Sequence, residues 1–269
     1  MKDSEPLFCL LCQGRWLPGQ VRINFQDHFH VLPPPHAERA EAFWQELAAT
    51  SGNHFYNGEL FRLEKFSASP DVLEMSLTRT CYRDQLYNNA HLPEMGEAAA
   101  TRGLGVSAIV ITSDGYTPII RRSLHLGEAP GMLDIIGGHA HPNLHLREGK
   151  PDLFAAIADE VTAELGLNPE HVKVECCNGL IEHPVTLKPD IVFLTRITPT
   201  MAQLEQLVKH ASEAEEFTEL LAVRVSAVAE FMATHRTELT PPALGCLTIL
   251  AEMQDWPGSL SLSTGTWRG

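Results

Sequence analysis

The chain has 269 residues, of which 44% are hydrophobic and 20% are charged, a globular composition that excludes collagen, coiled coils and wholesale disorder. At about 150 residues per domain, this length predicts one or two domains. The 20 basic against 34 acidic residues give a net charge of −14, which argues against partners such as nucleic acid or an anionic membrane surface.

The sequence also bears on the cellular location of the protein and on the redox state of its cysteines. No apolar run approaches the roughly 20 residues of a membrane span, and acidic residues precede the short apolar stretch near the N-terminus, unlike in a signal peptide. Cys9 and Cys12 form a single CxxC with no second pair to complete a zinc tetrad. We therefore expect buried thiols, with a redox or zinc role as the alternative, and a cytoplasmic location, with the nucleus as the other option.

The first hundred residues predict a small α+β unit. Strands are expected at Leu7–Cys12, Leu60–Phe66 and Val72–Leu77, and helices at Ala37–Ala49 and within residues 81–89. Two apolar runs then flank Ser-Asp-Gly in residues 103–123, a pattern typical of a β-hairpin. A short strand at Gly131–Ile136 is expected to stop at the Gly-Gly pair that follows it.

The clearest helix is predicted from about Asp152 to Leu165, because apolar residues recur at helical spacing and Gly166 follows as a C-cap. The later strands are expected at Val172–Ile181, Ile191–Ile197 and Leu220–Val225, and the later helices at Met201–Ala211, Val228–His235 and Pro242–Gln254. The last helix has Thr240 as its predicted N-cap. Strands that alternate with helices indicate an α/β sandwich with a mixed sheet and an N-terminal extension.

Two carboxylates on the clearest helix carry the predicted chemistry. Glu160 and Glu164 are four residues apart and share a face, which is expected to point away from the core, opposite the apolar stripe. The simplest interpretation is a pair of solvated glutamates. The alternative is a Mg²⁺ site, because this ion takes one or two carboxylates and completes its shell with waters and phosphate oxygens.

The surrounding order of strand, Gly-Gly, loop and helix resembles the signature of the Nudix hydrolases. Glu160, Glu164 and Gly166 match the family pattern, as do the apolar residues beside them. Asp159 stands in place of an Arg, and Ala163 in place of a metal-binding Glu. The connection from the glycines is longer than usual, so Asp152 lies only near the position of the first Glu.

Three further stretches are similar to the animal UDP-glucose diphosphatase branch of this superfamily: FRL…YRDQL, GLGVSAIVIT…RRSLHLGEAPGMLDIIGGH and DLFAAIADEV. The resemblance implies an α/β/α Nudix domain at 101–256, an N-terminal α+β domain at 1–100 that contributes to the substrate pocket, and a flexible tail at 257–269. It implies hydrolysis of UDP-glucose or UDP-galactose to UMP and the sugar 1-phosphate, with Mg²⁺ held by Glu160 and Glu164.

The same resemblance implies a set of substrate contacts. Aromatic rings would meet the uracil and ribose, a guanidinium would meet a phosphate, and the remaining residues would line the pocket. In this sequence the implied contacts are Tyr56, Tyr82, Arg122, Gly127, Asp134, His139 and His141. His141 stands where the branch has a Glu, and the start of the last helix, Thr240–Ala243, is expected to close the pocket. Packing aromatics, solvated rim charges and a polar histidine loop are the alternatives.

The proton acceptor and the metal count stay open at this stage. A base could come from Glu160 or from the acidic loop with Glu213, Glu215 and Glu216. The missing carboxylate at Ala163 predicts fewer bound metals, such as one. Two other functions stay open: hydrolysis of a different nucleoside diphosphate derivative, and an inactive Nudix fold that binds a nucleotide or a protein.

Overall fold

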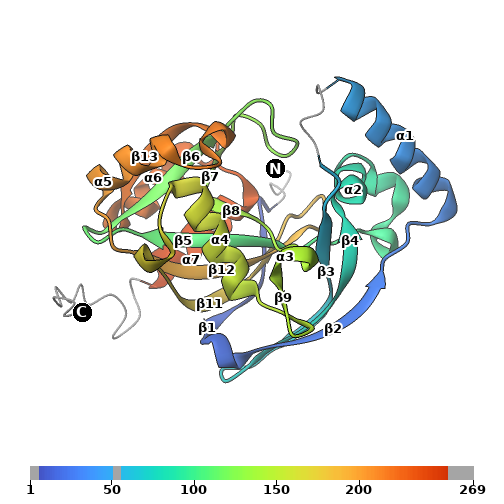
Figure 1. The fold of residues 1–269 in the computed structure, drawn as a ribbon, viewed down its shortest axis with the longest axis horizontal. Coiled ribbons are helices and arrows are strands. Elements are labelled where there is room, and N and C mark those ends of the chain that lie inside the picture. Colours follow the sequence, from blue (N-terminus) through green and yellow to red (C-terminus); the bar gives the residue numbers. More distant parts are fainter. Residues whose placement is uncertain (1–5, 51–55, 254–269) are drawn as a thin grey trace, which may run out of the picture.

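The computed structural model describes residues 6–50 and 56–253, so the tail predicted at 257–269 lies outside the described residues. Figure 1 shows an α/β sandwich beside a smaller N-terminal sheet. No helix in the described ranges is long and apolar enough to cross a membrane. The cytoplasmic location stays a prediction.

A five-stranded mixed sheet forms the centre of the molecule. Its order is β1 (Cys9–Trp16), β11 (Val172–Glu182), β12 (Pro189–Ile197), β5 (Gly105–Ile111) and β8 (Ile136–His139). Only the β12–β5 pair is parallel. All seven residues of β5 are buried, as expected for a strand that is covered on both faces.

The two faces of this sheet carry separate cores. On one face, Val106 of β5 packs in a cluster with Ile157 of α4 (Leu153–Leu165). On the other, Ile109 packs in a cluster with Leu250 of α7 (Pro241–Met253). Side chains alternate along β5 and therefore pack into both cores. The predicted α/β sandwich with a mixed sheet is confirmed.

The N-terminal region builds its own sheet. The strand order is β2 (Val21–Phe29), β4 (Leu73–Cys81) and β3 (Glu59–Ala68), and the helices are α1 (Pro34–Thr50) and α2 (Tyr82–Met95). The predicted elements are all present, and the helix expected within residues 81–89 continues through Pro93. Strand β1 instead pairs with β11 of the central sheet. The boundary near residue 100 stays a prediction.

The hairpin predicted in residues 103–123 is wrong as a strand pairing. The turn forms, with Thr112 N donating to Tyr116 O at 2.9 Å and Gly115 at a φ of +82°. Strand β5 nevertheless hydrogen-bonds to β12 and β8, while β6 (Tyr116–Arg122) lies between β13 (Phe217–Arg224) and β7 (Leu133–Asp134) in a second sheet. Because both edges of β5 are already paired, β6 turns away into that sheet.

The strand predicted at Gly131–Ile136 is also corrected. It divides into β7 and β8, and β8 runs through Gly137 and Gly138 instead of stopping there. A Cβ at Gly137 would overlap the carbonyl oxygen of Val106, so glycine is what lets β8 approach β5 closely.

The later elements, among them α6 (Val228–His235), agree with the predictions to within a few residues, except that α5 (Met201–Leu207) ends before the predicted Ala211. Three short elements, α3 (Pro142–His145), β9 (Leu146–Arg147) and β10 (Lys150–Pro151), lie in a stretch where none was predicted. Asp152 caps α4 by accepting from Ala155 N at 2.9 Å, and Gly166 ends it in the left-handed conformation. Thr240 caps α7 through Ala243 N, as predicted.

The six cysteines are free thiols. Cys176, Cys177 and Cys246 are fully buried in the cores, whereas Cys9 and Cys12 are half-buried on β1. Burial raises the pKa of Cys12. This environment suits a packed thiol better than a reactive one.

Candidate active site

One cavity of about 680 Å³ brings the N-terminal region together with the central domain. Its walls come from α2, the loop between β6 and β7, strand β8, helix α4 and the loop before β13. Eight of the predicted site residues line it: Tyr56, Tyr82, Arg122, Gly127, Asp134, His139, His141 and Glu160. The start of α7 also contributes, through Thr240, Pro241 and Pro242. The chemical role of each residue remains a proposal.

Glu164 is the one predicted site residue outside the cavity lining, and it lies directly beneath. Its side chain is only 2% exposed, and it accepts a hydrogen bond from Gly137 N at 3.0 Å. A Cβ at Gly138 would come within 2.6 Å of the Glu160 carboxylate. The carboxylate face of α4 therefore does not point away from the core, as the apolar stripe suggested, because β8 covers it. Gly138 thus leaves the space for the Glu160 carboxylate, and Gly137 supplies the N–H that Glu164 accepts.

The Glu160 and Glu164 carboxylates lie in surroundings that disfavour their negative charge. Burial, together with repulsion from Glu213 and Glu216, raises the pKa of Glu160 to about 8. Burial and the neighbouring Glu160 raise the pKa of Glu164 as well. Burial also raises the pKa of Glu213 and of Glu216. Four acids thus converge here without enough positive charge to keep all of them ionised at neutral pH.

This donor set fits a hard divalent cation. In the described part of the chain, no three His, Cys, Asp or Glu side chains surround one point as a closed metal cage would. Mg²⁺ does not need such a cage, since it keeps several waters and binds one or two carboxylates plus substrate phosphates. Glu160 and Glu164 fit this pattern, and a bound cation would relieve the repulsion that raises their pKa values.

Ala163 binds the acidic loop before β13 through its main chain. The carbonyl oxygen of Ala163 accepts from Ser212 Oγ at 3.3 Å and from Glu213 N at 3.4 Å. The acidic loop is therefore docked on α4 at this residue, with Glu213 and Glu216 half-buried and Glu215 exposed.

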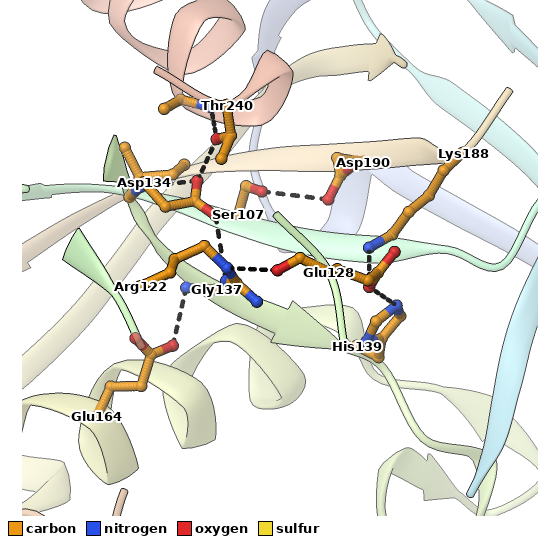
Figure 2. A network of polar contacts seen from close by, with 12 residues as sticks. Ser107, Arg122, Glu128, Asp134, Gly137, His139, Glu164, Lys188, Asp190 and Thr240 are labelled. Atoms are coloured by element: carbon orange, nitrogen blue, oxygen red, sulfur yellow. Dashed lines mark hydrogen bonds and ion pairs between the residues drawn. The ribbon is translucent and has the colours of Figure 1, made fainter. Parts of the chain in front are cut away.

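Arg122 lies across the cavity at the end of β6, held by Asp134 (Figure 2). Its Nη1 is 3.2 Å from Asp134 Oδ2. The other oxygen of Asp134 accepts from Thr240 Oγ1 at 2.6 Å and from Ile135 N at 2.9 Å. Asp134 is only 8% exposed, and these partners supply the compensation that a buried carboxylate needs.

A cluster of charged residues at the far wall was missed from the sequence. Figure 2 shows the Glu128 side chain between Lys188 and His139. Lys188 Nζ is 2.9 Å from one carboxylate oxygen, and Asn89 Nδ2 donates to the other at 2.8 Å. Burial opposes ionisation of Glu128, but Lys188 and its other neighbours outweigh it and lower the pKa to about 2.

Histidine and aspartate side chains complete this wall. Burial and the nearby Lys188 lower the pKa of His139 to about 3, so its ring is neutral at pH 7 and Lys188 is the cation that keeps Glu128 charged. Asp190 is 4% exposed and accepts from Ser107 Oγ at 3.3 Å. Burial raises its pKa to about 6. One available signal was the Lys188-Pro-Asp190 sequence before an apolar strand, where charges are costly unless paired.

The aromatic side of the cavity comes from the N-terminal region. The Tyr82 ring meets His139 edge-on, with ring centroids 5.7 Å apart, whereas Tyr56 is 80% exposed at the mouth. His141 Nδ1 lies 3.0 Å from Glu59 O. His145 turns away from the cavity toward Asp159, with 3.4 Å between Nε2 and Oδ2. His141 N also donates to His145 Nδ1 at 2.9 Å, so these two histidines are joined, whereas His139 lies beside Glu128.

Comparison with known proteins adds a family context. No family model matches the chain. It is 26% identical over 299 residues to the Homo sapiens protein named uridine diphosphate glucose pyrophosphatase NUDT22, covering 97% of each chain. It is 22% identical over 263 residues to Nudix hydrolase 9 of Arabidopsis thaliana, covering 82% of this chain and 84% of that one.

Among solved structures, the MutT protein from Methanosarcina mazei Go1 aligns with 57% of this chain and 95% of its own, at 16% identity and a TM-score of 0.40. The sequence relatives confirm the predicted resemblance to Nudix hydrolases of the UDP-glucose pyrophosphatase branch.

Proposed function

We propose, on the premise that the chain is similar to UDP-glucose pyrophosphatases along nearly all its length, that it is a Mg²⁺-dependent hydrolase of UDP-sugars. Its products would be UMP and the sugar 1-phosphate. The broader class, a hydrolase that acts on a diphosphate bond, is confirmed by the relatives. The observation that carries the proposal is the Glu160–Glu164 pair: Glu160 lines the same cavity as Arg122 and the tyrosines, and Glu164 is buried beneath it.

Different residues of the cavity are proposed to bind the different parts of the substrate. Tyr82 and Tyr56 offer rings for a uracil and ribose, and their position in the N-terminal region explains why that region contributes to the cavity. Arg122 offers its unused N–H groups to a phosphate oxygen. His139, His141 and Asp134 offer polar atoms for hydroxyl groups, while Gly127 leaves room at the loop. UDP-glucose and UDP-galactose are the substrates we propose.

The reaction requires an attack by water on a phosphorus atom surrounded by negative oxygens. Glu160 and Glu164 would hold Mg²⁺, which neutralises phosphate charge and lowers the pKa of a bound water. We propose that a single Mg²⁺ binds, because the Nudix signature of this chain lacks an acid at Ala163. The proton of the water must pass to a carboxylate. Glu213 and Glu216 suit this step because burial raises the pKa of each, which makes them stronger bases than a solvated glutamate.

Product analysis tests the proposal. The purified protein is incubated with UDP-glucose, with and without Mg²⁺, and the products are separated. We expect UMP and glucose 1-phosphate only with the metal, and turnover by Glu160→Gln or Glu164→Gln lowered by about 10²–10³-fold. Glu170→Gln, an exposed acid away from the cavity, is the matched control.

A panel of nucleoside diphosphate derivatives distinguishes the other functions. Faster cleavage of an ADP-sugar or a dinucleotide would keep the chemistry and change the substrate. Nucleotide binding without cleavage of any member would contradict the hydrolase and favour an inactive binding protein.

A further inference from the structure

The orientation of Arg122 depends on the loop that follows it. Besides the Asp134 contact, Arg122 Nε donates to the main-chain carbonyl of Glu128 at 3.0 Å. A guanidinium is planar and carries five N–H donors. Since two of these donors are held by different partners, the plane of the group is set where Arg122 lines the cavity.

The loop that supplies this carbonyl has little packing of its own. Leu124 is 82% exposed, and Ala129, directly after Glu128, has a φ of +44°. A left-handed conformation costs a non-glycine residue energy and persists only where its surroundings hold it. The loop therefore needs an anchor.

The Glu128 side chain anchors the loop to two other segments, α2 and the residue before β12, and Figure 2 shows its contact with Lys188. Asn89 of α2 and Lys188, just before β12, bind its two carboxylate oxygens. His139 Nε2, at the end of β8, lies 3.6 Å away. Asn89 is itself oriented by Gln85 Nε2 at 2.7 Å.

We propose that Glu128 is a positioning residue for nucleotide binding. Its side chain fixes the loop, its main-chain carbonyl holds Arg122 Nε, and Arg122 thereby presents a preformed edge to a diphosphate. No role in bond breaking is assigned to Glu128. The nature of the ligand rests on the proposed function, whereas the orientation of Arg122 does not.

The first test is independent of substrate. The Nε–H resonance of Arg122 is followed by ¹⁵N NMR in the free protein and assigned by its loss in Arg122→Lys. We expect slow solvent exchange in the wild type, and at least about tenfold faster exchange in Glu128→Gln, because an NH2 group replaces one carboxylate oxygen and faces Asn89 Nδ2 or Lys188 Nζ, which are themselves donors. Unchanged exchange would overturn the proposal.

The second test uses kinetics with UDP-glucose and Mg²⁺. Loss of an oriented, charge-assisted contact predicts a KM about tenfold higher in Glu128→Gln, with kcat changed less than about threefold. In an Arg122→Lys background, which has no Nε to orient, the same substitution should change KM less than about twofold. If the KM increases of the two single variants multiply in the double variant, Glu128 acts only on the fold and does not orient Arg122, which would overturn the proposal.

Two controls separate the possible failures. If Glu128→Gln does not fold, Glu128→Gln with Lys188→Met removes the surplus donor and takes its place in both tests. If the wild type cleaves no UDP-sugar, the proposed function fails, while the Arg122 exchange rate still decides the positioning role.

Discussion

The floor and the far wall of the cavity shift the pKa values of their carboxylates in opposite directions. At the floor, Glu160 lies among other acids and its pKa rises to about 8. At the far wall, Glu128 is paired with Lys188 and its pKa falls to about 2. Both groups are largely shielded from water, so burial alone does not separate them. The difference is whether the chain supplies its own cation, and we propose that Mg²⁺ binds at the wall where it does not.

The largest expected effect is on catalysis at the floor. Glu160→Gln removes a proposed metal ligand, so we expect kcat with UDP-glucose and Mg²⁺ to fall by about 10²–10³-fold. The same variant should be at least as stable as the wild type without metal, because it removes a repelled carboxylate. Thermal unfolding in EDTA measures this, and a marked loss of stability there would mean that the Glu160 charge is already compensated within the chain.

At the far wall the opposite response is expected. Lys188→Met leaves the Glu128 carboxylate without its cation, which should cost about 3 kcal/mol of unfolding free energy. Adding Glu128→Gln to Lys188→Met should recover most of that loss, because the uncompensated charge is gone. Urea denaturation of the two single variants and the double variant measures the coupling. Additive losses would show that Lys188 is not the partner that matters.

Glu160 at the floor and Glu128 at the far wall should also contribute to stability over different pH ranges. Since the folded pKa of Glu160 is raised above its unfolded value near 4.5, its contribution is present at low pH and is lost as pH rises toward 8. The folded pKa of Glu128 is lowered, so its contribution is present above about pH 4.5 and is lost as pH falls toward 2.

We therefore expect the melting temperature of the metal-free protein to fall by several degrees between about pH 5 and 8. Mg²⁺ should reverse this fall, because it binds the folded state and favours the ionised carboxylates. Calorimetry across this range, with Glu160→Gln as the control that flattens the profile, measures the effect. The same slope with and without Mg²⁺ would argue against the carboxylate pair as the metal site.

The smallest expected effect concerns Asp134, a carboxylate that the chain compensates with both a cation and neutral donors. Thr240→Ala removes a hydroxyl that both donates to Asp134 and caps α7. We expect a loss of about 1–2 kcal/mol of stability. Thr240→Ser keeps the hydroxyl and is the matched control, so an equal loss in that variant would point to packing of the methyl group instead.

Much of this site could be predicted from local sequence. The apolar stripe, the N-cap at Asp152 and the C-cap at Gly166 define α4, and the i, i+4 spacing places Glu160 and Glu164 on one face of it. The resemblance then selected residues that the fold brings into one cavity. These features depend on neighbours within a few turns or on a motif, which is why a single sequence contains them.

The pairing of strands and charges was decided by contacts between distant segments. The predicted hairpin failed because β12 and β8 occupy both edges of β5, and neither partner is visible from the Ser-Asp-Gly turn. The side chains that meet at Glu128 come from three different elements, so no local pattern marks them. Composition and local patterns predict most of the long helices and strands, whereas the sign of each buried pKa shift depends on which charges the tertiary structure places within a few ångströms.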